Sequence, residues 1–116
     1  MANGKAEVLR GHEAYKARLA AGENVKRRET GNSMVPKIYS REEIEYKPIK
    51  GPEDVKEGDV VWCKVKGNHF THLVKAKRLE GEVWRFQIGN NKGGVNGWIG
   101  IENIFARAIS VKGRPL

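Results

Sequence analysis

The feature that most constrains the fold is a pair of strand-like segments separated by a short turn sequence. Residues 59–65 read Asp-Val-Val-Trp-Cys-Lys-Val, and a second strand-like segment, residues 70–77, follows Gly67-Asn68. β-Branched and aromatic residues favour strands, and a Gly-Asn pair between two such segments is typical of a hairpin turn. The sequence therefore predicts an antiparallel β-hairpin over residues 59–77.

A third strand-like segment, residues 82–88, alternates between two faces. One face carries Trp84, Phe86 and Ile88. This period of two predicts a half-buried strand. Residues 41–54 predict a short strand followed by a loop, because prolines and a glycine interrupt them. Residues 89–97, which are rich in Gly and Asn, predict a flexible polar loop.

The first 29 residues differ from the rest in composition. They are rich in Ala, Lys, Arg and Glu and contain no proline, which favours a helix. Asn3 is the expected cap of its start and Gly22 of its end. The apolar stripe of this helix is thin and consists of Val8, Leu9, Tyr15 and Leu19. We therefore divide the chain into an N-terminal helical and basic arm, residues 1–29, and a β domain, residues 30–116.

The charge and the cysteine content of the chain limit the kinds of binding partner and of cellular compartment that we expect. The chain has 22 Lys and Arg residues against 14 Asp and Glu residues, and the net charge of +8 favours acidic surfaces or nucleic acid. Within the arm, Lys26-Arg27-Arg28 fits either a solvated linker or a phosphate or docking contact. The single cysteine, Cys63, excludes an internal disulfide. No apolar run is long enough for a membrane span, so we expect a soluble, cytoplasmic protein.

A candidate active site begins at residues 31–38, which read Gly-Asn-Ser-Met-Val-Pro-Lys-Ile. Gly31 and Pro36 restrict the backbone on either side of Ser33. A serine hydroxyl is a weak nucleophile unless a base takes its proton, and His72 is the candidate base. The two residues are far apart in the sequence, so the fold has to bring them together.

Residues 31–38 resemble the Ser-Met-x-Pro box of the signal peptidase I family and the Gly-Asp-Ser-Met box of the LexA and UmuD self-cleaving proteins. Three later segments are similar to that family in the same order. Residues 56–61 resemble a Gly-Asp strand opening, residues 70–74 the strand of the general base, and residues 104–111 the closing strand. The resemblance covers residues 31–111. It implies a mostly β, LexA/signal peptidase-like β fold, of the short stand-alone kind that phages encode, and the composition of residues 1–29 adds an N-terminal helical arm to it.

The resemblance implies that Ser33 is the nucleophile and His72 the general base of a serine peptidase. Bacterial signal peptidases and LexA-like proteins use lysine as the base, whereas the archaeal and endoplasmic-reticulum signal peptidases resemble this chain in using histidine. Imidazole starts near a pKa of 6.5 and needs little adjustment, whereas a lysine must fall from about 10.4. Lys64 and Lys75 remain alternative bases.

A third residue is expected from the loop at residues 89–97. In the resembling family a carboxylate there orients the histidine, and the matching position here is Asn90. Neither aspartate of this chain, Asp54 or Asp59, is placed like that carboxylate. The sequence therefore predicts a Ser/His dyad assisted by Asn90 or Asn96.

Substrate contacts are expected around the nucleophile. The Ser33 N–H and the Asn32 side chain are candidate donors to the oxyanion of an acyl-transfer intermediate. The resemblance implies a shallow apolar pocket at Met34, Val35 and Pro36, and Asn90 is a further candidate for oxyanion or substrate contact. A neighbouring strand would hold an extended peptide by β-addition.

Two functions follow from this sequence. The first is a serine peptidase that cleaves a protein partner or itself, with Ala21-Gly22 as the candidate site of self-cleavage. The second is a catalytically inactive domain of the same fold that binds nucleic acid or protein through its basic arm. Cys63, His69 and His72 contain possible zinc ligands, but structural zinc normally takes four, so we expect neither a metal nor another cofactor.

Overall fold

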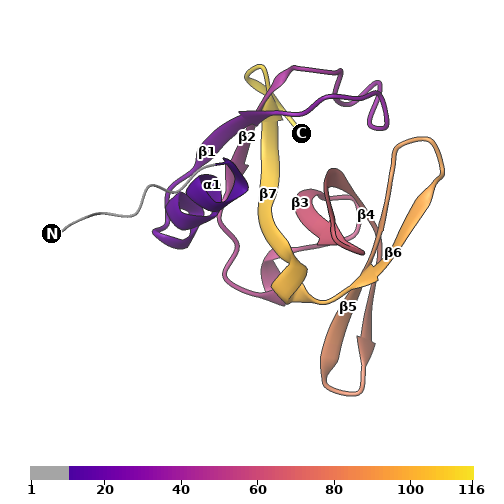
Figure 1. The fold of residues 1–116 in the computed structure, drawn as a ribbon. Coiled ribbons are helices and arrows are strands. Elements are labelled where there is room, and N and C mark those ends of the chain that lie inside the picture. Colours follow the sequence, from indigo (N-terminus) through magenta and orange to yellow (C-terminus); the bar gives the residue numbers. More distant parts are fainter. Residues whose placement is uncertain (1–10) are drawn as a thin grey trace, which may run out of the picture.

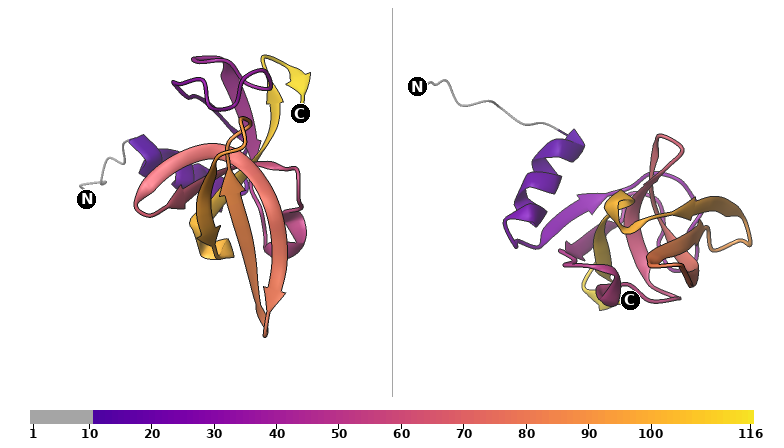
Figure 2. Two further views of the ribbon diagram at one scale, coloured as in Figure 1. Left: turned by 90° about the vertical axis from the view of Figure 1, so that its right-hand side faces the viewer. Right: turned by 90° about the horizontal axis from the view of Figure 1, so that it is seen from below.

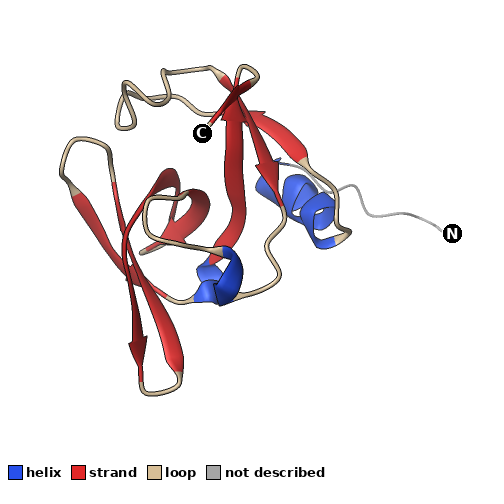
Figure 3. Ribbon diagram, turned by 180° about the vertical axis from the view of Figure 1, so that it is seen from behind, coloured by secondary structure: helices blue, strands red, loops and turns tan. Residues whose placement is uncertain are grey.

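The computed structural model describes residues 11–116 and shows a mostly β protein with one antiparallel sheet. Strands lie in the order β1-β2-β7-β3-β4-β5-β6, and β8 pairs with β7. Figure 1 shows α1 beside β1 and β2, at one end of the sheet. Seen from behind, the short helices lie at the periphery and most of the described chain is strand or loop (Figure 3). The mostly β prediction is therefore confirmed.

The elements of residues 11–116 are, in chain order, α1 (Gly11–Ala20), β1 (Val25–Arg28), β2 (Glu43–Lys47), the 3-10 helix η1 (Pro52–Asp54), β3 (Val60–Val65), β4 (Asn68–Glu80), β5 (Val83–Gly89), β6 (Val95–Ile99), the 3-10 helix η2 (Ile101–Asn103), β7 (Ile104–Val111) and β8 (Arg114–Pro115).

Two apolar clusters form the core. One contains Tyr46 and Trp62, and the other contains Phe86 and Ile88, all four fully buried. β4 connects the two regions because it changes partner along its length: residues 68–73 pair with β3, and pairing with β5 begins at Leu73. Figure 2 shows that this long strand is strongly curved.

The predicted hairpin is present as β3 and β4. Its turn lies at Lys66-Gly67, one residue before the Gly67-Asn68 turn that the sequence suggested. Both turn residues have left-handed φ, 51° and 85°, as a two-residue type I′ hairpin turn requires. Asn68 already pairs with Val65 as the first residue of β4.

The prediction for residues 82–88 is confirmed as β5, but the predicted loop at residues 89–97 is too long. Its last three residues belong to β6, where Gly97 pairs with Ile88. A glycine can join a ladder through its backbone alone, which composition does not reveal. Trp84, expected on the buried face, is 37% exposed because the β4–β5 hairpin extends beyond the core (Figure 1).

The helix prediction for the N-terminal region is confirmed over Gly11–Ala20, and Gly22 follows it with a left-handed φ of 89°. Leu19 packs into the first apolar cluster and is 5% exposed. The predicted positions of Asn3, Val8 and Leu9 lie outside the described residues. Within residues 11–116 no helix is long and apolar enough to cross a membrane.

The linker interpretation of Lys26-Arg27-Arg28 is wrong. These residues belong to β1, which pairs with β2 along Val25–Arg28. Val25 and Arg27 are buried while Lys26 and Arg28 are exposed, the alternation of a strand with one covered face. The strand therefore ties part of the predicted arm to the sheet.

Candidate active site

The loop between β1 and β2 carries Ser33 and is anchored by two buried side chains. Met34 and Ile38 are 4% and 5% exposed and belong to the first apolar cluster. The Ile38 N–H donates to the Met34 carbonyl, 3.0 Å, and closes a turn directly after Ser33. The Arg41 N–H closes the base of the loop by donating to the Glu29 carbonyl, 2.6 Å.

A second loop holds the Ser33 backbone from the other side. The Asn91 N–H donates to the Ser33 carbonyl, 2.9 Å, and its side-chain amide donates to the Val35 carbonyl, 3.2 Å. Sequence reasoning missed Asn91. Its neighbour Asn90 marked this loop as relevant, but only the three-dimensional contact distinguishes the two.

Ser33 in the β1–β2 loop contacts His72 on β4. Ser33 Oγ lies 2.9 Å from Nε2 of His72 on β4. This is a hydrogen-bond distance suited to proton transfer from a nucleophile to a base. Of the three candidate bases, His72 makes a hydrogen bond with the Ser33 hydroxyl, whereas Lys64 and Lys75 make none with it.

Asn96 holds the other nitrogen of the imidazole. His72 Nδ1 lies 2.7 Å from Asn96 Oδ1 on β6. An amide oxygen only accepts, so Nδ1 carries the proton and Nε2 offers its lone pair to the Ser33 hydroxyl. A general base requires this tautomer. Of the two asparagines that the sequence left open, Asn96 therefore makes the contact.

Asn90 has a different place. Its Oδ1 accepts hydrogen bonds from the N–H groups of Lys92 and Gly94, both 2.8 Å, so it shapes the β5–β6 loop. It also lines the cavity at Ser33. Of the two alternatives for orienting His72, Asn90 is therefore not the one that contacts the imidazole, because its side-chain oxygen is used within its own loop.

His72 is 6% exposed and stacks on Phe70, with ring centroids 4.6 Å apart. Burial lowers the pKa of His72 below 6.5, while the hydrogen bond to Asn96 and the charge of Glu29 act in the opposite direction. The neutral form of the imidazole is thus favoured near pH 7. Phe70 was not predicted, although residues two apart on a strand share a face.

A cavity of about 510 Å³ opens beside Ser33 and His72. Met34, Ile38 and Ile44 contribute apolar surface to it. Of the predicted substrate-contacting residues, Met34 and Asn90 line this cavity, whereas Asn32, Val35 and Pro36 do not. Asn32 and Pro36 are exposed instead, because the loop turns toward solvent at both positions.

A polar network supports the strand next to His72. The Thr71 hydroxyl donates to Glu29 Oε1, 2.7 Å, and lies 2.8 Å from the Tyr46 hydroxyl. Arg27 Nη1 donates to the same Glu29 oxygen, 3.0 Å. The guanidinium also lies over the Trp62 ring, 4.1 Å from its centroid. Sequence reasoning missed this network, because its members come from three separate strands and a loop.

Residues 11–116 contain no group of three or more His, Cys, Asp or Glu side chains placed to hold a metal ion. Cys63 is buried, and burial raises the pKa of its thiol to about 12, which disfavours the thiolate that binds metal. His69 Nδ1 accepts a hydrogen bond from Trp62 Nε1, 3.1 Å.

Comparisons with protein-family models, with curated proteins and with solved structures give no match for this chain. The positions of Ser33, His72 and Asn96 are therefore the observations that bear on its function.

Proposed function

We propose that this chain is a serine endopeptidase of the LexA/signal peptidase-like type. Ser33 is the nucleophile, His72 the general base, and Asn96 the residue that orients the imidazole. The observation that carries the proposal is the unbroken chain of hydrogen bonds from Ser33 Oγ through both nitrogens of His72 to Asn96 Oδ1. The antiparallel, mostly β architecture is compatible with that fold type.

The chemistry follows from this hydrogen-bond chain. As Ser33 Oγ attacks the scissile carbonyl carbon, its proton moves to His72 Nε2, and the negative charge collects on the carbonyl oxygen. Nε2 then gives the proton to the leaving amine, and a water hydrolyses the acyl-enzyme by the reverse order of transfers. Asn96 keeps Nδ1–H in place throughout. Its neutral amide orients the imidazolium but stabilises it less than a carboxylate would.

Backbone donors are available for the oxyanion. Among residues 11–116, the N–H groups of Ser33 and Met34 donate no hydrogen bond. We assign the Ser33 N–H, as expected from the sequence, to the developing oxyanion. Asn32 is exposed and its side chain makes no hydrogen bond with the described residues, so it stays a candidate second donor.

The substrate is an extended peptide that lies along β4. Residues 68–72 pair with β3 on one side, and their other edge has no strand partner among residues 11–116 because pairing with β5 begins at Leu73. This edge borders the cavity, which includes His69 through His72. An unpaired edge accepts an extended chain through its backbone. The apolar lining at Met34, Ile38 and Ile44 then receives a small apolar side chain.

Cleavage of a separate protein fits the structure better than self-cleavage at Ala21-Gly22. The N–H groups of these two residues donate to the carbonyls of Ala17 and Leu19 in the last turn of α1. β1 follows within a few residues and is paired with β2. Bringing Gly22 to Ser33 in the same molecule would therefore require both the helix end and β1 to detach.

The test uses a serine-reactive fluorophosphonate together with peptides that carry small residues before the scissile bond. We expect the probe to label Ser33, located by mass spectrometry. Ser33→Ala should remove labelling and lower peptide cleavage by at least about 10³-fold. Ser110→Ala, which changes a serine on β7, is the matched control and should behave as the wild type. A folded wild type that is neither labelled nor active would leave the binding-module function, which salt-dependent DNA binding would then test.

A further inference from the structure

A second cleft lies between the end of α1 and the segment that follows β2. Its volume is about 580 Å³, which is within the usual range for small-molecule sites. Its lining combines the apolar side chains of Leu19 and Ile49 with three cationic residues, Lys47, Lys50 and Arg107. It shares no lining residue with the cavity at Ser33. We call it the cationic cleft.

Two of these cations lie next to each other on neighbouring strands of the sheet. Lys47 on β2 and Arg107 on β7 are direct register partners. Side chains of such partners lie on the same face about 5 Å apart, and like charges at that spacing are destabilising. Among residues 11–116, no carboxylate oxygen lies within 4.0 Å of a charged nitrogen of either residue. In addition, Arg107 Nε is buried without a hydrogen-bond partner.

The same sheet contains a comparable pair whose charges are compensated. Arg78 on β4 and Arg85 on β5 are also direct register partners. There, Glu80 contacts both guanidinium groups, Arg78 through one carboxylate oxygen and Arg85 through the other. A cross-strand pair of cations in this sheet can thus be neutralised by a carboxylate of the same chain. The Lys47 and Arg107 pair has none in the described residues, which leaves room for an external anion.

The remaining polar groups of the cationic cleft define the charge of that anion. Asp54 is the acidic residue in its lining, and one of its oxygens accepts the Lys50 N–H, 2.7 Å. Three cations and one carboxylate leave a local charge of about +2, which matches a phosphate monoester near pH 7. At the end of α1, the carbonyls of residues 17–19 already accept hydrogen bonds from residues 21–23.

We propose that the cationic cleft binds a phosphate monoester with an apolar body. The phosphate oxygens lie between Lys47 and Arg107, where they supply an acceptor for the buried Nε and relieve the repulsion between the two cations. The body of the ligand packs against Leu19 and Ile49. Lys47 and Lys50 are both exposed and Arg107 is half-buried, so the phosphate site opens to solvent, and Lys50 adds a further charge at its entrance.

The test compares three probes on the full chain at constant ionic strength: phenyl phosphate, phenylacetate and inorganic phosphate. Calorimetry and thermal unfolding give the affinity and the stabilisation. We expect phenyl phosphate to bind at least about tenfold more tightly than phenylacetate, because a carboxylate supplies only one charge. Inorganic phosphate should bind more weakly than phenyl phosphate, since it leaves the apolar wall uncovered.

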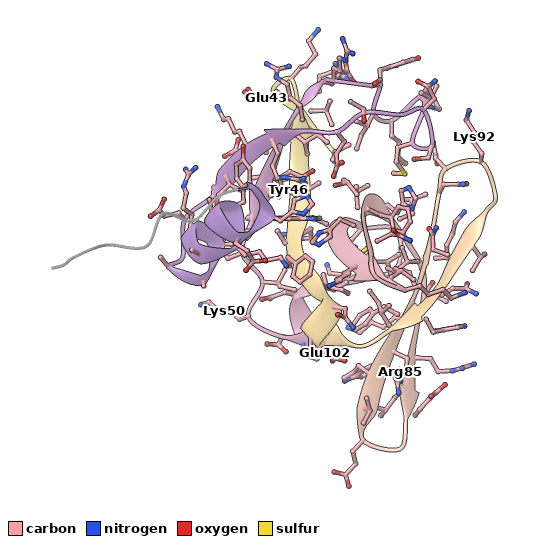
Figure 4. The ribbon with its side chains drawn as sticks, viewed as in Figure 1. Glu43, Tyr46, Lys50, Arg85, Lys92 and Glu102 are labelled. Atoms are coloured by element: carbon pink, nitrogen blue, oxygen red, sulfur yellow. The ribbon has the colours of Figure 1, made fainter. Side chains whose placement is uncertain are left out.

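The decisive variant is Lys47→Glu, because it should act in opposite directions on two measurements. Without ligand, the new carboxylate pairs with Arg107 and raises the melting temperature. With phenyl phosphate, affinity falls by at least tenfold. Lys92→Glu is the matched control, since Lys92 and Lys50 lie at opposite ends of the molecule (Figure 4), and it should change neither quantity.

Three outcomes would overturn the proposal: no binding of phenyl phosphate by the wild type, equal binding of phenylacetate, or unchanged phosphate binding by a folded Lys47→Glu variant. If that variant does not fold, Lys50→Gln takes its place, because Lys50 is exposed. It should weaken phenyl phosphate binding severalfold, and unaltered affinity in this variant would equally contradict the proposal.

Discussion

The two clefts of this molecule differ in how their polar groups are satisfied. At Ser33, the hydroxyl, both imidazole nitrogens and the Asn96 oxygen are joined to one another. In the cationic cleft, Lys47 and Arg107 lie next to each other with no carboxylate within 4.0 Å in residues 11–116. The first set is complete without a ligand, as expected for groups that move a proton among themselves. The second set becomes complete only when an anion arrives.

This difference separates two kinds of functional evidence. A preorganised hydrogen-bond chain indicates chemistry, because the catalytic groups must hold their geometry before the substrate binds. An uncompensated pair of charges indicates binding, because like charges on neighbouring strands repel each other and an anion between them relieves that repulsion. Experiments that disturb one cleft should therefore leave the other unchanged.

After Ser33→Ala, the largest effect on peptide cleavage is expected for Asn96→Ala. Without the acceptor at Nδ1, the imidazole loses its fixed tautomer and a hydrogen bond to the imidazolium, which is worth about 1.5–3 kcal/mol. Peptide cleavage should fall by about 10- to 150-fold, measured as kcat/KM. Phenyl phosphate affinity should not change. Asn103→Ala, a change in η2 at a side chain that makes no hydrogen bond with the described residues, is the control, and equal loss in both variants would contradict the role of Asn96.

The network beneath β4 should matter next, through stability. Glu29→Gln removes the carboxylate that pairs with the buried Arg27, whose side chain is 7% exposed. We expect the free energy of unfolding to fall by about 1–3 kcal/mol, measured by urea denaturation. Glu43→Gln is the matched control. Its ion pair with Arg28 spans 3.9 Å between exposed side chains and should contribute less than about 1 kcal/mol. Similar losses in the two variants would show that the network has no special role.

The smallest effect is a shift of the pH profile. Burial lowers the pKa of His72 below 6.5, so the acid limb of kcat/KM should have its midpoint below that value. Activity should rise as the pH increases through this midpoint, because only the neutral imidazole takes the Ser33 proton. Asn96→Asp places a carboxylate next to Nδ1, favours the imidazolium and should move the midpoint upward. A downward shift, or none, would contradict the hydrogen bond between His72 and residue 96.

Much of the sheet could be predicted because its signals are local. The β-branched residues of β3 and the alternation of Phe86 and Ile88 on β5 are visible in any short window. β6 could not be predicted from its composition, because Val95-Asn96-Gly97 is typical of a loop. Only the pairing of Gly97 with Ile88 shows that these residues form a strand. β1 was hidden for a related reason, because its basic side chains gave no sign that Arg27 is buried.

The candidate site was predictable in part. Ser33 and His72 were nominated because residues 31–38 resemble the Ser-Met-x-Pro box and because later segments resemble the same family in the same order. The choice between Asn90 and Asn96 depends on which of them the β5–β6 register brings to the imidazole, and no local pattern contains that register. The contact of Thr71 with Glu29 is likewise a long-range outcome of packing.

The partner change along β4 has a practical consequence for inhibitor design. An extended peptide docked on residues 68–72 would point every second amide toward β4 and the others toward solvent, because the orientation of the peptide groups alternates along a strand. N-Methylation of a peptide inhibitor should therefore prevent binding at every second position, where the amide points toward β4, and be tolerated at the positions between. The positions that tolerate a methyl group would show the inhibitor's register against His72. Methyl groups at those positions would also protect the compound from degradation.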